Sequence, residues 1–502
     1  MTTTYKYPNE MKSWKNLIVE SKNFKPLIDN SKNLMGISKY KKCGIEIDFS
    51  RQNLNQHILN KLIELAEESN LIEKKLNFFK GNLNFSSNKI SPLHMALRAK
   101  VDSDYLWKKE INHLVGNEME RFLHFSEQLR EDKVLGWDKT PIKNVIVFGL
   151  GGSILGSRLA VDVLSDEKNS DDNLNIFFVS NPDCHKLNLI LMKLKAKETL
   201  FLILSKSLKT PEIMILKDRG SSWLTECGCP KFHLNKHFAV VTSNVNQSFT
   251  IDFLDEHSFH IWEWVGGRFS VWSAIGLPIA LTVGKKKFEQ FLEGAREMDN
   301  HFLNSELKNN LPVITALLSV WNRNFLGFPS YAISTYSSKL DLFVPYIQQL
   351  DMESLGKNVH LNGKNCSIET GQSVWGGPGI EGQHAYFQLF HQGKQIIPVD
   401  FYGVKNDSFP TKIQSKNQNF VNLNLKSQAD SLCVGDKEKN FEGNRPSTIF
   451  WLDSLSPKIL GSLLSMHEHR IFSLACIWDI NPFDQPGVEL GKKLLANSLS
   501  KY

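Results

Sequence analysis

The chain has 502 residues, more than one ordinary hydrophobic core requires, so two or three domains are predicted. Hydrophobic residues make up 41% and charged residues 22%, as in typical globular proteins, and the longest apolar run, residues 269–283, is too short to cross a membrane. The net charge of +6 comes from scattered basic residues, which favours small anionic ligands and argues against nucleic-acid binding.

The N-terminal stretch MTTTYKYPNEMKSWKN has no apolar core, so we predict no secretory signal. The seven cysteines are scattered and odd in number, which suits a reducing compartment and predicts a cytoplasmic location. Cys227, Cys229, His233 and His237 are metal-ligand residue types at short range. Because the Cys-x-Cys spacing is tighter than usual for a structural zinc site, a loop with unpaired ligands is favoured over zinc.

Residues 1–110 are predicted to form a mainly helical segment that packs on the larger domain, because residues 58–66 repeat apolar side chains at helical spacing. A first α/β domain is predicted over 111–283. Its strands are expected at 145–148, 175–179, 199–204 and 238–242, with helices near 154–165, 184–194 and 211–225. Strands that are apolar throughout and separated by helices predict a parallel sheet covered on both faces.

A second α/β domain is predicted over 284–455, followed by a helical C-terminal tail over 456–502. Its strands are expected at 330–334, 395–401 and 448–451, with helices near 286–303, 311–324, 339–350, 382–392 and 456–470. The polar stretch 405–447 is predicted to be a helix flanked by loops, and the apolar stretch 269–283 a buried helix.

Arg268 is the only basic residue between His260 and Lys285, and aromatic, aliphatic and small residues surround it. A guanidinium in such a setting is costly unless an anion meets it. Gly266 and Gly267 remove side chains just before it, so that backbone or ligand can approach closely. Two interpretations stay open from this window: a binder of a phosphate, carboxylate or oxyanion, and a structural arginine paired with an acid elsewhere.

Two polar loops follow predicted strands of the first domain. The first, residues 149–157, includes Gly152 and Ser153 and opens a helix, but it matches neither the dinucleotide fingerprint nor the Walker A loop. The second, residues 205–212, has Thr210 as a predicted N-cap before a proline. Its hydroxyls and lysine at a helix N-terminus suit a simple phosphoryl group, whereas an ordinary capped helix would need only Thr210. The candidate phosphate ligands of this loop are Ser205, Lys206, Ser207 and Thr210.

Three further segments carry polar groups beside glycine turns, at 348–357, 379–386 and 483–492. Glu353 is a candidate general base, although an exposed loop acid is equally consistent with its surroundings. His384 is a candidate proton carrier, although a capping or core histidine is the more common outcome. The third segment contains Gln485 and Lys492 in a tight polar turn that is unusual for a surface tail.

Taken together in chain order, these segments resemble the phosphoglucose isomerase family. Residues 264–276 and 483–492 are similar to the two signature regions of that family, and residues 93–98 and 441–447 extend the resemblance over most of the chain. The resemblance implies two SIS-type (sugar isomerase) doubly wound α/β domains, each a parallel sheet flanked by helices, in a homodimer. It also implies cofactor-free and metal-free interconversion of glucose 6-phosphate and fructose 6-phosphate, a step of glycolysis and gluconeogenesis.

The resemblance also assigns roles to residues of this chain. Glu353 is the implied base that moves a proton between C2 and C1 through a cis-enediol, and Arg268 stabilises the enediolate oxygen. Gln349 and Gln485 are implied to contact the sugar. His384, contributed by the neighbouring subunit, and Lys492 are implied to assist ring opening. The implied phosphate ligands are Gly152, Ser153, Ser205, Lys206, Ser207 and Thr210.

Several positions depart from the family pattern: Ile154, Lys209, Leu355, Gly377, Ile380 and Pro486. None of them removes an implied catalytic group, and Lys209 is expected to tighten phosphate binding. Two other interpretations remain. One is an isomerase with a broader range that includes mannose 6-phosphate. The other is a sugar-phosphate-binding regulator without turnover, which is disfavoured because Glu353, Arg268 and His384 are all present.

Overall fold

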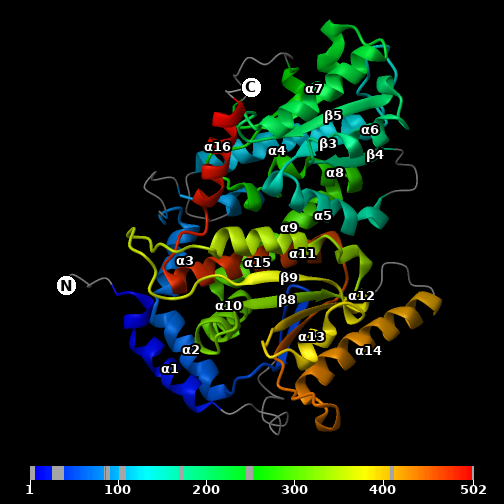
Figure 1. Cartoon of the computed structure of the whole chain (residues 1–502). Helices are drawn as coiled ribbons and strands as arrows, with labels where there is room; N and C mark the ends of the chain where they lie inside the picture. Colours follow the sequence, from blue (N-terminus) through cyan, green and yellow to red (C-terminus); the bar gives the residue numbers. More distant parts are fainter. Residues whose placement is uncertain are drawn as a thin grey trace.

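Two sheets with central parallel strands organise the chain, one in each half of Figure 1. The computed structural model describes residues 6–24, 39–83, 85, 91–100, 109–168, 174–244, 253–406 and 412–499. The expected fold class, α/β with two parallel sheets flanked by helices, is confirmed.

The first sheet is parallel throughout, in the order β4-β3-β5-β6-β7. Its central strands are fully buried apolar runs, as expected of a sheet with helices on both faces. The short last strand was not expected from the sequence. The strands are β3 (Asn144–Gly149), β4 (Asn175–Val179), β5 (Thr199–Leu204), β6 (Phe238–Thr242) and β7 (Ser258–His260), and the helices around them are α4 (Lys109–Arg130), α5 (Leu155–Val163), α6 (His185–Leu191), α7 (Pro211–Glu226) and α8 (Leu277–Val283).

The second sheet has the order β1-β2-β11-β10-β8-β9, with four parallel strands and an antiparallel hairpin at one edge. The hairpin comes from the N-terminal segment, which was predicted to be mainly helical, and its two strands were not expected from the sequence. The strands are β1 (Lys39–Lys42), β2 (Ile45–Arg51), β8 (Ser330–Thr335), β9 (Ser373–Pro378), β10 (Val399–Val404) and β11 (Ser447–Leu452), and the helices of this half are α10 (Leu311–Val320), α11 (Phe343–Gln348), α12 (Gly379–Gln383), α13 (Phe387–Gln392) and α14 (Lys412–Val434).

Two long helices, α9 (Lys285–Asn304) and α15 (Pro457–Trp478), lie against each other between the sheets (Figure 1). Almost every residue of α15 is buried, so this helix is a central core element, whereas the sequence predicted that it begins the C-terminal tail. The backbones approach closely because Gly294 and Gly461 carry no side chain at the crossing, where a Cβ would collide with main-chain oxygen. The loops that lie between the two sheets are anchored on this core.

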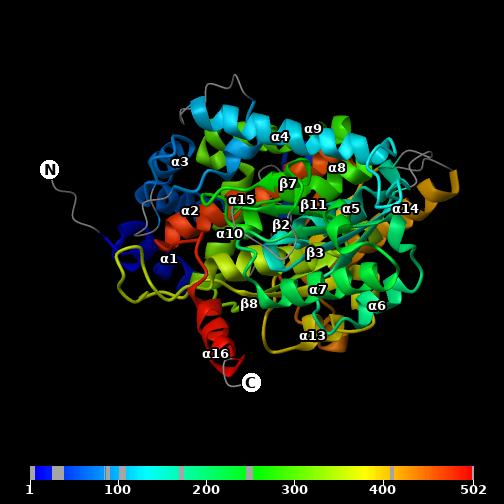
Figure 2. The ribbon, with the colours of Figure 1, turned by 90° about the horizontal axis from the view of Figure 1, so that it is seen from above.

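The remaining helices lie at the two ends of the chain. The N-terminal helices α1 (Lys12–Asn23), α2 (Gln56–Glu68) and α3 (Leu71–Phe79) pack beside the second sheet and α15. The C-terminal helix α16 (Glu489–Leu499) projects from the body, as Figure 2 shows from above. Over the ranges that the structure describes, no helix is both long and apolar enough to cross a membrane.

Candidate active site

Arg268 lies in a single 3-10 turn, Gly267–Phe269, and only 4% of its surface is exposed. Its Nε donates a hydrogen bond to Ser354 Oγ at 2.6 Å, and Nη1 donates to Gln485 Oε1 at 3.1 Å. Its Nη2 donates to the backbone carbonyl oxygens of Pro482 and Asp484. These four acceptors satisfy most of the guanidinium N–H groups, and because they are neutral they do not cancel its positive charge.

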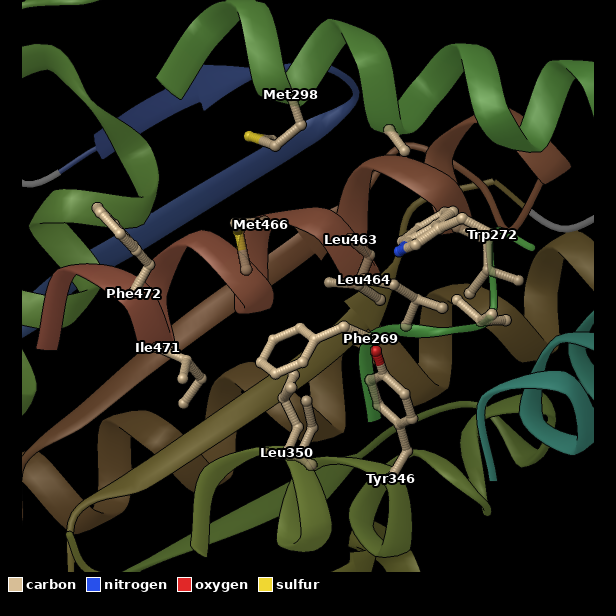
Figure 3. Close-up of a cluster of buried hydrophobic side chains, with 14 of the residues drawn as sticks. Phe269, Trp272, Met298, Tyr346, Leu350, Leu463, Leu464, Met466, Ile471 and Phe472 are labelled. Carbon is tan, nitrogen blue, oxygen red and sulfur yellow. The ribbon is translucent and has the colours of Figure 1, made fainter. Parts of the chain in front are cut away.

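Two sets of contacts fix the turn that holds Arg268. The next residues, Phe269 and Trp272, insert among side chains of α9, α11 and α15 in the core between the sheets (Figure 3). Gly152 lies against the backbone of the turn, where a Cβ would stand 2.3 Å from Gly267 C and 2.4 Å from Arg268 N. Position 152 therefore accepts only glycine, and the arginine has little freedom to move.

Glu353 is the acid that approaches this cation, with its Oε2 3.5 Å from Arg268 Nη1. It ends a π-helical turn, Gln349–Glu353, that continues α11. Such turns are frequent at functional sites. The turn is anchored by the buried Asp351 carboxylate, which accepts hydrogen bonds from Arg470 Nη1 at 2.7 Å and from the Tyr331 hydroxyl at 3.0 Å. The Glu353 side chain itself keeps 23% exposure, so it is open to a ligand.

Gln349 begins the same turn and approaches the Gly151 loop, where a Cβ on Gly151 would stand 2.9 Å from Gln349 Nε2. Gly151 has φ +53°, a conformation that glycine adopts without strain. The structure therefore brings together five of the predicted site residues around one point between the sheets: Gly152, Arg268, Gln349, Glu353 and Gln485.

The second polar loop follows β5 and leads into α7. Ser205 Oγ accepts a hydrogen bond from the Leu208 amide at 3.2 Å, and Ser207 Oγ accepts one from the Lys209 amide at 3.3 Å. Thr210 occupies the N-cap position of α7, but its side chain makes no capping hydrogen bond. The serine hydroxyls use their oxygens to shape the loop, so their O–H groups are available to donate to an anion.

Lys206 connects this loop to the arginine turn. Its Nζ donates to the backbone oxygens of Glu263 at 2.9 Å and Val265 at 3.3 Å, a few residues before Arg268. It also forms an ion pair with Glu263 Oε2 at 3.1 Å. Sequence reasoning missed Glu263 as a partner of Lys206. The two residues are 57 positions apart, and no sequence pattern links a glutamate between two tryptophans to a lysine that far away.

His384 and Lys492 lie apart from this cluster. His384 is the exposed C-cap residue of α12, and its backbone N–H bonds to Glu381 O. Lys492 stands on the projecting helix α16 and forms an ion pair with Glu489 at 2.8 Å. Within the part of the chain that the structure describes, no hydrogen bond or ion pair joins either side chain to Arg268 or Glu353.

Burial sets the acid–base properties of the cluster. It lowers the pKa of Arg268 to about 10, against the opposing effect of Glu353 and Asp484. Burial and the nearby Arg268 also lower the pKa of Lys357, a residue that sequence reasoning did not select, to about 8. The buried guanidinium of Arg268 is therefore suited to stabilising negative charge that develops on a ligand oxygen.

Two of the positions that depart from the family pattern, Ile154 and Leu355, are buried apolar residues beside the site. Ile154 is buried at the start of α5 below the Gly149 loop, where it fills space against Gly149. Leu355 is 1% exposed and lies at the end of the Glu353 helix. Both therefore contribute packing below the site and no polar group within it.

The phosphoglucose isomerase family model matches residues 48–502 of this chain. A glucose-6-phosphate isomerase of Pseudoalteromonas translucida is 37% identical over 476 residues, covering 90% of this chain and 86% of the relative. A glucose-6-phosphate isomerase of Shewanella woodyi is also 37% identical, over 473 residues. The crystal structure of a glucose-6-phosphate isomerase from Chlamydia trachomatis matches with a TM-score of 0.90 at 30% identity, covering 99% of this chain and 96% of that one. A Thermus thermophilus protein at 23% identity, with a TM-score of 0.65, shares the fold.

Proposed function

Because the chain belongs to the phosphoglucose isomerase family and is a glucose-6-phosphate isomerase, we propose that the cluster around Arg268 and Glu353 is its catalytic centre. In the proposed reaction, Glu353 takes the proton from C2 of the open-chain aldose and returns it to C1 through a cis-enediol, while the carbonyl moves from C1 to C2. A proton next to a carbonyl is weakly acidic, so the reaction needs a base and a positive charge beside the developing oxyanion.

The observation that carries this proposal is the 3.5 Å approach of Glu353 Oε2 to Arg268 Nη1. The arginine is buried and its hydrogen-bond acceptors are neutral, so its charge is available to an enediolate oxygen. In this position the guanidinium supplies the charge that a metal ion supplies in other enolising enzymes. Gln349 and Gln485 border the same point and are proposed to bind the sugar hydroxyls.

The phosphate of the substrate is proposed to bind at the carboxyl edge of the first sheet. Ligands of open α/β sheets bind at this edge, and the N-terminus of α7 points a positive dipole end into it. Gly152 and Ser153 border this position on the loop after β3, and the loop after β5 supplies the remaining proposed ligands: Ser205, Lys206, Ser207 and Thr210.

His384 and Lys492 are proposed to assist ring opening, with His384 reaching the site of a second copy in a homodimer. The support is that His384 is exposed and separate from the Arg268 cluster of its own chain. In addition, α16 and the turn before it expose the apolar side chains Val488, Leu490, Leu494 and Leu495, an unusual face for a helix that projects from the body (Figure 2).

We also propose that the enzyme works in the cytoplasm as part of glycolysis and gluconeogenesis. All seven cysteines are free, as is usual in a reducing compartment.

The test is conversion of fructose 6-phosphate to glucose 6-phosphate by the purified protein in the presence of a chelator, with a coupled nicotinamide readout. We expect turnover in chelator, and we expect Glu353→Gln to lose about 10²- to 10⁴-fold in kcat while it still binds sugar phosphate. Equal turnover in the mutant would remove Glu353 as the base. An inactive wild-type chain that sugar phosphate still protects from thermal unfolding would support the regulator interpretation.

A further inference from the structure

Lys357 is a buried lysine whose ammonium bonds both to the helix that carries Glu353 and to the segment that carries Gln485. Its Nζ donates to the backbone carbonyl oxygens of Glu353 at 2.6 Å and Ser354 at 3.0 Å. It also donates to the carbonyl oxygen of Asp484 at 3.1 Å and lies 3.5 Å from the Asp484 carboxylate. Only 10% of its side chain is exposed, so these contacts are shielded from water.

The helical end at Glu353 explains why a cation is useful there. The helix that starts with α11 continues through the π-turn and ends at Leu355, so its last carbonyl groups have no intrahelical partner. The negative end of the helix dipole lies at the same place. Lys357, two residues beyond the end, turns back and donates to two of these carbonyls, which fixes the backbone of Glu353 itself.

The other side of Lys357 holds the chain segment Pro482–Gln485, called here the strap. The carbonyl oxygen of Asp484 accepts hydrogen bonds from both Arg268 Nη2 and Lys357 Nζ, each at 3.1 Å. The strap therefore lies between two buried cations. Its last residue, Gln485, accepts a hydrogen bond from Arg268 Nη1 through its side-chain oxygen. Without Lys357, only Arg268 would join the strap to the end of the Glu353 helix through these polar contacts.

We propose that Lys357 is a positioning residue that sets the distance between the base Glu353 and the sugar-binding residue Gln485 by joining the end of the Glu353 helix to the strap. Lys357 touches no reacting atom in this role. The inference rests on the proposed function for the identity of Glu353 as the base, whereas the link between helix and strap stands on the contacts alone.

Holding this cation in place costs stability. Burial, together with the nearby Arg268, lowers the pKa of Lys357 to about 8, while Asp484 and Glu353 act in the opposite direction. A lysine whose pKa is lower in the folded than in the unfolded chain makes the fold less stable below that pKa than it would be with a neutral side chain. A costly buried charge that remains beside a reacting centre is characteristic of a group kept for function.

The deciding experiment compares Lys357→Met with Lys357→Arg and with the control Lys364→Met, an exposed lysine on the following turn. We expect Lys357→Met to reduce kcat for fructose 6-phosphate by about 10- to 100-fold, as for a misplaced base, with a change in Tm of only a few degrees. Inhibition by inorganic phosphate, which probes the first-domain loops, should be unchanged. Lys357→Arg should restore most of kcat and move the alkaline limb of the pH profile above pH 8, since arginine stays protonated.

Hydrogen exchange at the amides of residues 483–488 gives a readout that does not depend on turnover. Faster exchange in Lys357→Met than in Lys364→Met supports the link even if the wild-type chain fails to convert fructose 6-phosphate, so the two proposals fail separately. The inference is overturned if Lys357→Met keeps kcat within about twofold of wild type or leaves strap exchange unchanged. It is also overturned if Lys357→Met loses kcat, phosphate inhibition and thermal stability together and Lys357→Arg restores none of them.

Discussion

The two sheets end in polar loops at equivalent carboxyl edges, yet the loops differ in charge. After β5, Lys206 pairs with Glu263, whose side chain is 65% exposed and free to yield to a ligand. After β8, Lys339 pairs with Asp166, whose side chain is only 9% exposed, so this pair is less open to solvent. The second edge also borders a cavity of about 480 Å³ whose charged lining residues are Lys339, Asp341 and Glu381.

This difference assigns separate tasks to two similar architectures. Burial, with Asp162 and Glu381 nearby, raises the pKa of Asp341. With two acids against one lysine in the cavity lining, the second edge is a less favourable place for a phosphate than the first. The first edge keeps hydroxyls, a helix N-terminus and an exchangeable lysine for an anion. In the proposed reaction the base, Glu353, comes instead from the second domain, through the helix that follows β8. On this proposal, the two similar sheets separate phosphate binding from proton transfer.

The largest expected effect tests the charge that lies between the two domains. Arg268→Lys should reduce kcat by about 10²-fold or more with a small change in KM, because a point charge replaces a planar fork that bonds in several directions. Steady-state kinetics on fructose 6-phosphate measure the changes in kcat and KM separately. Arg219→Lys on α7 is the control, and its kcat and KM should stay near those of wild type. A change confined to KM would make Arg268 a substrate binder.

The next effect tests whether His384 completes the site of a partner subunit. His384→Ala and Glu353→Gln should each be strongly impaired, but a mixture co-assembled in equal amounts should recover about one quarter of wild-type activity. Half of the dimers are then mixed, and each mixed dimer has one site with both wild-type groups. Absence of recovery in co-assembled mixed dimers would place His384 in its own subunit's site or outside catalysis.

A matched pair of serines compares the two edges directly. Ser207→Ala should raise KM for fructose 6-phosphate by about 10-fold, the value of one hydrogen bond to a charged group, with kcat less affected. Ser337→Ala at the equivalent edge of the second sheet should leave both parameters within about twofold. An equal response of KM to both substitutions would contradict the assignment of phosphate to the first edge.

The smallest expected effect concerns the ion pair between Lys206 and Glu263. Glu263→Gln should lower KM by about twofold, because an exposed pair is worth little and its removal frees the lysine for phosphate. The effect should shrink as salt concentration rises, which kinetics at two ionic strengths can measure. A higher KM in this variant would show that Glu263 orients Lys206 rather than competing with the ligand.

The strands that the sequence predicted best are continuous apolar runs. The buried runs of β3, β5 and β6 were expected within a residue or two of their observed ends. The missed strand β9 contains Gly376 and Gly377, which have low strand propensity, and Gly376 is required because a Cβ there would stand 1.9 Å from Ile333 O. The missed strand β1, Lys-Tyr-Lys-Lys, is a polar edge strand that pairs only with β2.

The site was predictable only in its parts. The isolation of Arg268 in an apolar run left open whether it binds a ligand anion or pairs with an acid of the chain. No spacing shows that Glu353 reaches it, because the two positions meet only through tertiary packing. Ser354 and Lys357 act through contacts that depend on where the helix ends. Such contacts follow from the assembled backbone, so a single sequence does not reveal them.

The contact of Gly152 with the arginine turn has a consequence for how binding energy is used. The loop after β3 borders the proposed phosphate position and presses with no intervening side chain on the backbone of Arg268. If the phosphate binds there as proposed, we expect its binding energy to act on the position of Arg268 at the reacting end of the substrate. An unphosphorylated hexose should forfeit turnover as well as affinity, and the ratio of kcat for fructose 6-phosphate to kcat for fructose measures how much catalysis the phosphate supplies.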